Sequence, residues 1–223
     1  GVNPFRCEVI PYGDHAVNML PPCDPSEARL ALNLPEHETI CIMFGTVSPY
    51  KGILECVKYW KKNQLEAATL YIVGPVTNNA YAEKIRSAAE GQKNIQLRIS
   101  KSWLGEAELR QWLSAADCAL FNYKEIFTSG AAALARSFGL PLLIPERLKC
   151  ADLMEPHSHV FRFESLDKDF FKQLMKVLEI KPSYTSAEDW RQHTSWENVA
   201  RLTAEAYNRW MVDGSRWEES YRP

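Results

Sequence analysis

Residues 114–144 read SAADCALFNYKEIFTSGAAALARSFGLPLLI, and this stretch decides the fold. It contains two short apolar runs, at residues 118–121 and 140–144, and each is bounded by turn or breaker residues, as buried strands of a parallel sheet are. The Ala-rich segment 130–138 between them predicts a helix, because Gly139 and the proline two positions later form a common stop signal after a helix. The stretch therefore predicts a strand, a helix and a second strand.

The front of the predicted helix carries residues that suit an anion. Thr128 and Ser129 offer hydroxyl groups, and Gly130 has no side chain to hold a ligand away from the backbone. Free N–H groups and the positive end of the helix dipole meet at this point, which favours a phosphate. The same residues also fit an ordinary Ser or Thr helix cap, so this turn does not establish a site by itself.

A second turn strengthens the hypothesis of a phosphate site. Residues 44–52, FGTVSPYKG, follow a predicted strand at 39–44. Gly45 frees the backbone after that strand, and Lys51 places an ammonium beside the next helix, which begins near Gly52. Since open α/β sheets bind ligands at the carboxyl edge of their strands, the two turns are predicted to converge on one pyrophosphate.

The order of predicted elements indicates an α/β protein with an open, mostly parallel sheet and helices on both faces. The predicted strands are residues 7–10, 39–44, 67–73, 95–99, 118–121, 140–144 and 159–163. Residues 1–180 are predicted to form one domain. The polar residues 181–187 are typical of a linker, and residues 181–223 are predicted to be a C-terminal helical tail that packs on the domain or on a preceding one.

Composition limits the possible partners. The chain has 223 residues, 46% of them hydrophobic, and a net charge of -2, so it can bury a large core but has no general attraction to nucleic acid or to an anionic membrane. The six cysteines are scattered without a CxxC pair, which favours free thiols in a reducing compartment and argues against a zinc site.

Several of these segments together resemble a known family, the C-terminal, nucleotide-sugar-binding domain of family 4 (group 1) glycosyltransferases, which have the GT-B fold. The resemblance implies a Rossmann-like domain that is one half of a GT-B protein. The segments that carry it are Ala116-Asp117, Asn122-Tyr123, Thr128-Ser129-Gly130, the FGLP of residues 138–141, Phe44-Gly45 and Lys51-Gly52.

The resemblance implies transfer of a sugar from a nucleotide-diphosphate sugar to a glycan or lipid acceptor, as in polysaccharide biosynthesis. The nucleotide sugar would be a substrate, with no cofactor and no metal. An N-terminal acceptor-binding domain would be the missing partner, and any membrane association would occur only through it. We expect a cytoplasmic enzyme of which this chain alone is inactive.

The resemblance also implies roles for individual residues. Lys51 and Glu125 are the expected catalytic residues. The expected phosphate-binding residues are Gly45, Thr46, Lys51, Gly52, Thr128, Ser129 and Gly130, and the expected base or ribose contacts are Gly74, Ser100, Lys101, Trp103 and Tyr123.

Two pairs of neighbouring residues have alternative interpretations. Trp103 and Leu104 also fit the packing of a helix against the sheet. Asp14 and His15 either line the cleft between the two domains or simply form a turn.

The sequence departs from the family at two positions. Thr46 stands where the family usually has an arginine, and a hydroxyl cannot make the charged bidentate contact of a guanidinium. Leu134 stands where the ribose-binding glutamate is expected. The alternative is therefore a catalytically impaired nucleotide-sugar-binding or scaffolding domain, with a sugar-nucleotide epimerase as a more distant option. The sequence has no GxSxG, GxGxxG or Walker A motif, which argues against a serine-hydrolase nucleophile, a dinucleotide-binding loop and a P-loop, respectively.

Overall fold

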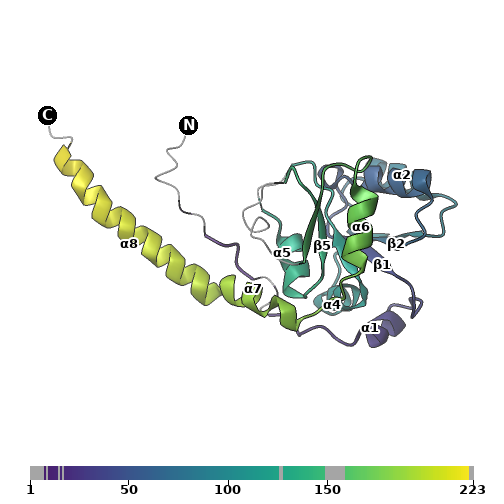
Figure 1. Cartoon of the computed structure of the whole chain (residues 1–223), viewed down its shortest axis with the longest axis horizontal. Helices are drawn as coiled ribbons and strands as arrows, with labels where there is room; N and C mark the ends of the chain where they lie inside the picture. Colours follow the sequence, from purple (N-terminus) through teal and green to yellow (C-terminus); the bar gives the residue numbers. More distant parts are fainter. Residues whose placement is uncertain are drawn as a thin grey trace.

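The structure is a computed structural model that describes residues 8, 10–14, 16, 18–125, 128–148 and 159–220, the last nine of them by their backbone alone. Six parallel strands form one sheet in the order β3-β2-β1-β4-β5-β6. Figure 1 shows this sheet with helices packed around it. The strands are β1 Ile40–Phe44, β2 Thr69–Pro75, β3 Ile95–Ser100, β4 Cys118–Leu120, β5 Leu142–Pro145 and β6 Val160–Phe163.

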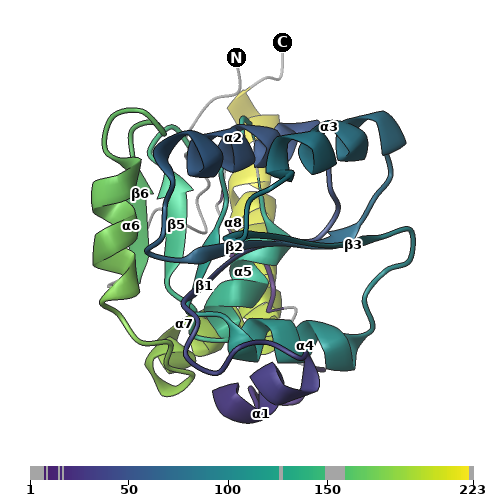
Figure 2. The same cartoon turned by 90° about the vertical axis from the view of Figure 1, so that its right-hand side faces the viewer.

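The sheet is buried on both faces because its central strands carry apolar residues at every position. In β1, Cys41 and Met43 pack on one face, whereas Ile40, Ile42 and Phe44 pack on the other. Helices α2, α3 and α6 cover the first face and α1, α4 and α5 the second, so the predicted α/β layering is confirmed (Figure 2). These helices are α1 Pro25–Ala31, α2 Ile53–Asn63, α3 Asn79–Ala89, α4 Glu106–Ala115, α5 Gly130–Ser137 and α6 Phe170–Leu178.

The predicted strand at residues 7–10 is not found. Glu8 and Ile10 are not in a strand, and Cys7 and Val9 lie outside the described residues. The six described strands follow the other six predictions to within two residues at each end, and Cys23, Cys41, Cys56 and Cys118 are free thiols.

The polar segment that follows α6 is packed on the domain. The Ser183 amide donates to Gly139 O at 3.1 Å, and Gly139 has φ 76°. A Cβ at Gly139 would lie 2.1 Å from Ser183 O, so only glycine allows this approach. The segment continues into helix α7, Glu188–His193.

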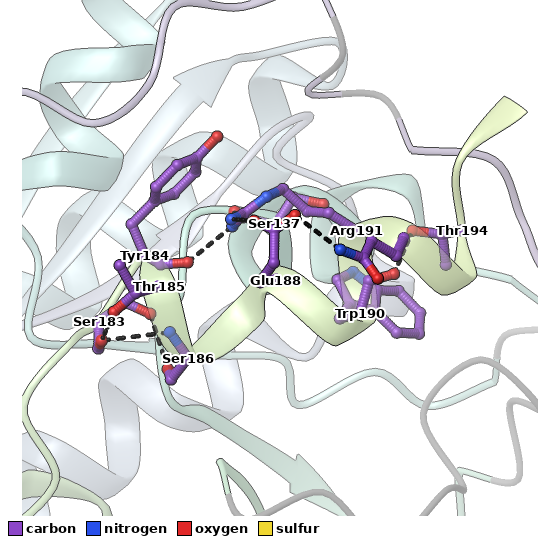
Figure 3. Close-up of polar contacts among 10 residues, drawn as sticks. Ser137, Ser183, Tyr184, Thr185, Ser186, Glu188, Trp190, Arg191 and Thr194 are labelled. Atoms are coloured by element: carbon purple, nitrogen blue, oxygen red, sulfur yellow. Dashed lines mark hydrogen bonds and ion pairs between the residues drawn. The ribbon is translucent and has the colours of Figure 1, made fainter.

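Two arginines fasten α7 to the C-terminal end of α5. Arg191 donates to Ser137 O at 3.0 Å and to Tyr184 O at 2.8 Å, and its guanidinium carbon lies 3.6 Å from the centre of the Tyr184 ring (Figure 3). Arg136 lies 3.8 Å above the Trp190 ring. Helix α8, Trp196–Ser220, then extends away from the sheet (Figure 1). The division of the chain at residue 180 stays a prediction.

Candidate functional site

The loop after β1 crosses the end of β2 at close range. The Gly45 amide donates to Val73 O at 3.0 Å, and Gly45 has φ 85°. A Cβ at Gly74 would lie 2.3 Å from Gly45 O. Both positions therefore need glycine, and their contact fixes the backbone at this part of the carboxyl edge.

Lys51 ends the short 3-10 turn Pro49–Lys51 and is buried, with 5% of its surface exposed. Its Nζ donates to Phe44 O at 2.9 Å and lies over Gly45, where a Cβ would be only 2.8 Å away. Burial lowers the pKa of Lys51 to about 8, because desolvation disfavours the charged amine. Within the described ranges, no carboxylate forms an ion pair with it.

The chain after β4 lies directly against this turn. Asn122 Nδ2 donates to Gly52 O at 3.1 Å. The buried Tyr123 ring has its centre 5.7 Å from Lys51 Nζ, which is within range of a cation–π contact. Burial also raises the pKa of the Tyr123 hydroxyl, so that group stays neutral.

Helix α5 begins beside the same tyrosine. Ser129 is its N-cap: Ser129 Oγ accepts from the Ala132 amide at 3.1 Å and lies 3.5 Å from the Tyr123 hydroxyl. The Gly130 and Ala131 amides, in the first turn, have no acceptor in the part of the chain that the structure describes. The helix therefore offers two unused N–H groups as well as the positive end of its dipole.

The two predicted turns thus converge. Lys51 and Ser129 both contact Tyr123, and Gly45 and Gly130 line one pocket of about 290 Å³. The site lies between β1 and β4, where the strand order changes direction, which is the position at which open α/β sheets bind ligands. The pocket is lined by Tyr12, Phe44, Gly45, Pro75, Trp103, Leu104, Leu109, Gly130, Ala131 and Leu134.

Other nominated residues lie at the margin of this arrangement. Ser100 Oγ donates to Ser102 O, and neither Ser100 nor the exposed Lys101 lines the pocket. Thr46 is half-buried next to Gly45. Thr128 and Glu125 are exposed, and neither side chain has a hydrogen bond or ion pair in the described structure. Their binding or catalytic roles stay predictions.

The structure distinguishes between the alternatives at two positions. Trp103 is 74% exposed, so its interpretation as a core residue is wrong, whereas Leu104 does pack against the core. Asp14 is buried and its Oδ1 accepts from Ser137 Oγ at 2.7 Å and from the Ala16 amide at 2.8 Å, which makes it a turn residue. His15 lies outside the described residues.

Arg147 is a basic residue of this edge that the sequence analysis missed. Its Nη2 donates to Tyr123 O at 2.9 Å and lies 3.5 Å from Asn122 Oδ1. It therefore holds the segment that separates Lys51 from Ser129. The one sequence signal for it was its position two residues after β5, at the same carboxyl edge.

The described residues contain no cluster of metal-ligating side chains. Among the helices that the structure describes, none combines the length and apolar character needed to span a bilayer.

Comparison with known proteins gives matches at the level of structure. No protein-family model and no curated protein matches the sequence. Sucrose-phosphate synthase from Thermosynechococcus elongatus matches with a TM-score of 0.67 and 17% identity, over 92% of this chain and 53% of the synthase. Anabaena HepE in complex with UDP and glucose matches with a TM-score of 0.67 and 16% identity, over 90% of this chain and 56% of HepE.

A third match covers a separate domain. The C-terminal domain of the group 1 glycosyl transferase LpcC from Francisella tularensis matches over 78% of this chain and 93% of that domain, with a TM-score of 0.51 and 16% identity. The chain has the fold of one half of a GT-B glycosyltransferase. It spans about half the length of the first two structures, 53% and 56%, and at these identities the similarity establishes the fold alone.

Proposed function

We propose that this chain is the donor-binding half of a glycosyltransferase that transfers a sugar from a nucleotide-diphosphate sugar to a glycan or lipid acceptor. The observation that carries the proposal is the convergence around Tyr123. Tyr123 contacts both the buried ammonium of Lys51, which has no described carboxylate partner, and Ser129 at the N-terminus of α5, where two N–H groups are unused.

These groups suit a leaving diphosphate. Negative charge builds up on the phosphate oxygens as the bond to the sugar breaks, so donors fixed in advance stabilise the transition state more than the ground state. Lys51 supplies a full charge, and the Gly130 and Ala131 amides supply hydrogen bonds. Protein groups would thus provide the positive charge in place of a cofactor. Glu125, exposed on the loop after β4, is the proposed contact for the donor sugar.

The acceptor would bind on a second domain that this chain does not include. HepE, one of the structural matches, is described with bound UDP and glucose. We propose a nucleotide-sugar donor for this chain as well, because of the phosphate-binding groups at its own candidate site. We place the proposed enzyme in the cytoplasm, and assign any membrane contact to the second domain.

Calorimetric titration of the chain with UDP, ADP and GDP tests the proposal. At least one nucleotide is expected to bind, and both Lys51→Ala and Lys51→Met should abolish the heat. Lys58→Ala, on the exposed side of α2, is the control that removes a lysine outside the site. Unchanged affinity in the two Lys51 variants would show that the phosphate group is not bound here. Thermal unfolding checks that each variant is folded.

A catalytically impaired binding domain is the second candidate, favoured by Thr46 and by the burial of Leu134 in the pocket wall. The two candidates differ in turnover, since both predict nucleotide binding. The natural full-length protein should release nucleotide diphosphate from its donor sugar in the presence of acceptor if it is an enzyme. Tight binding of the donor without release would favour the impaired domain.

A further inference from the structure

Strand β3 forms one end of the sheet, and nothing in the part of the chain that the structure describes pairs with its outer edge. On the inner edge, the Leu70 amide donates to Asn94 O and the Val76 amide to Ser100 O. Because the backbone groups of successive residues in a strand point to opposite edges, the even-numbered residues of β3 bond to β2. The residues whose N–H and C=O groups point outward are Ile95, Leu97 and Ile99.

This edge lacks the features by which proteins usually protect a terminal strand. The sequence of β3, IQLRIS, contains neither proline nor lysine, and Arg98 is its one charged residue. The strand pairs with β2 along its whole length, without a bulge. The strand at the opposite end of the sheet, β6, is shorter, with four residues against six. A long, unbroken and largely apolar edge is a template for pairing with another chain.

A groove of about 390 Å³ lies beside this edge, on the face of the sheet that α3 covers. The groove is lined by Arg86, Ser87, Ala89, Glu90, Ile95 and Leu97. Leu97 and Ile99 pack against the core under α3 but stay partly exposed. An occupant of the edge that carries apolar side chains on this face would therefore fill the groove and complete the burial of both residues.

We propose that a second copy of this chain binds here, with its β3 antiparallel to the first and a two-fold axis at Leu97. This register places Leu97 opposite the partner's Leu97 and Ile95 opposite the partner's Ile99. All three outward-pointing residues then form hydrogen-bonded pairs, in which the two residues exchange both of their bonds. The two sheets become one continuous sheet, and the same surface serves both copies, as in most symmetric dimers.

The apolar side chains favour a second copy as the occupant. Residues directly opposite each other in an antiparallel pair place their side chains on the same face of the sheet. The partner's Leu97 therefore packs on Leu97, and the partner's Ile99 packs on Ile95 at the groove. A copy of the same strand thus supplies apolar side chains at the positions where the groove is open.

The polar residues are also self-complementary in this register. On the opposite face of the sheet, Gln96 lies opposite the partner's Arg98, so that the two arginines do not face each other and the Gln96 amide oxygen can accept a hydrogen bond. Arg86 and Glu90, which both line the groove, carry opposite charges. Across a two-fold axis each charge on one copy has an opposite charge available on the other.

Sedimentation equilibrium of the chain at about 5 to 500 µM tests the proposal. A monomer–dimer equilibrium is expected, with a dissociation constant of about 10–100 µM, because one strand edge forms a small interface. Leu97→Lys places two ammonium groups opposite each other at the axis and should weaken the dimer at least about tenfold. Val160→Lys adds the same charge at a partly buried residue of β6 and should leave the dissociation constant unchanged.

A disulfide tests the register. In a hydrogen-bonded antiparallel pair the two Cα atoms lie about 5.5 Å apart, within the range that a disulfide spans. Leu97→Cys should therefore form a covalent dimer on mild oxidation by air, seen on a denaturing gel without reductant, whereas Val160→Cys should behave as the unaltered chain does. The cysteine pair decides the question if thermal unfolding shows that Leu97→Lys does not fold.

Three outcomes would overturn the proposal. The first is a chain that stays monomeric at about 500 µM. The second is a dimer that Leu97→Lys does not weaken; if Trp210→Ala, which removes an exposed aromatic ring from α8, abolishes that dimer, the contact lies on α8 instead. The third is equal cross-linking of Leu97→Cys and Val160→Cys. None of these results bears on nucleotide binding, so the proposed function is tested separately.

Discussion

Binding of a diphosphate should be coupled to proton uptake by Lys51. In the free protein burial lowers the pKa of this lysine to about 8, and no described carboxylate restores it. A diphosphate placed beside the ammonium would favour the charged form and return the pKa toward its usual value of about 10.4. The site therefore binds its ligand best when the lysine is already protonated, below pH 8.

The size of the effect follows from these two pKa values. Free protein is about 10% deprotonated at Lys51 at pH 7 and about 90% deprotonated at pH 9, so the affinity for UDP should fall about tenfold between these pH values. Binding of each UDP molecule should be accompanied by the uptake of about 0.1 proton at pH 7 and about 0.9 proton at pH 9. The phosphate of the nucleotide ionises near pH 6, so about 10% of it is still protonated at pH 7 but almost none at pH 9, and the proton uptake near pH 9 is the decisive measurement.

The assay is calorimetric titration with UDP from pH 7 to pH 9, repeated in buffers of different ionisation enthalpy so that proton uptake is measured directly. Lys51→Arg is the matched variant, because arginine stays charged throughout this range. It should bind UDP with an affinity that does not change with pH and without proton uptake. An affinity of the unaltered chain that stays constant from pH 7 to pH 9, with no buffer dependence, would refute the reasoning.

Three further predictions concern stability in urea. Because the pKa of Lys51 is lowered in the folded protein, the unfolded chain binds more protons than the folded one between pH 8 and pH 10. The free energy of unfolding should therefore rise by about 1 kcal/mol from pH 7 to pH 9 relative to Lys51→Met. Parallel pH profiles of stability for the unaltered chain and Lys51→Met would contradict this. Gly139→Ala, whose Cβ would lie 2.1 Å from Ser183 O, should cost at least about 3 kcal/mol, whereas Gly91→Ala, with the same φ of 76° but nothing within 4 Å, should cost about 1–2 kcal/mol; equal costs would exclude crowding as the cause. Arg191→Ala should lower the free energy of unfolding by about 2 kcal/mol, whereas the exposed Arg201→Ala should lower it by less than about 0.5 kcal/mol. Equal losses would show that residues 183–194 do not stabilise the domain.

The sequence predicted the sheet because each central strand is a continuous apolar run between breakers. It also predicted that the β1 and β4 turns meet, since the carboxyl ends of parallel strands share one edge. Both inferences depend on local patterns: the apolar run before Gly45, and the hydroxyl and glycine residues at 128–130. The N-cap of α3 is equally local, since Asn78 Oδ1 accepts from the Tyr81 amide three residues later at 3.0 Å.

Contacts between distant segments could not be predicted in this way. Arg147 reaches Tyr123 from the next strand, and no spacing in the sequence links the two residues. The Ser- and Thr-rich residues that precede α7 were interpreted as a linker, because their packing depends on Arg191 and on Gly139, which lies more than forty positions earlier. The burial of Lys51 was also not predictable, since a lysine after a proline turn is usually exposed.

The position of Lys51 is easier to explain by ligand binding than by stability. Lysine side chains normally reach solvent with their ammonium, because burying the charge costs free energy unless a partner compensates. Here Nζ has the Phe44 carbonyl and the face of Tyr123, which are neutral groups, and a pKa of about 8 records that they do not fully replace water. A neutral side chain at this position would avoid the penalty. An anion that arrives from outside the described chain would remove it, and the adjacent N-terminus of α5 favours the same charge.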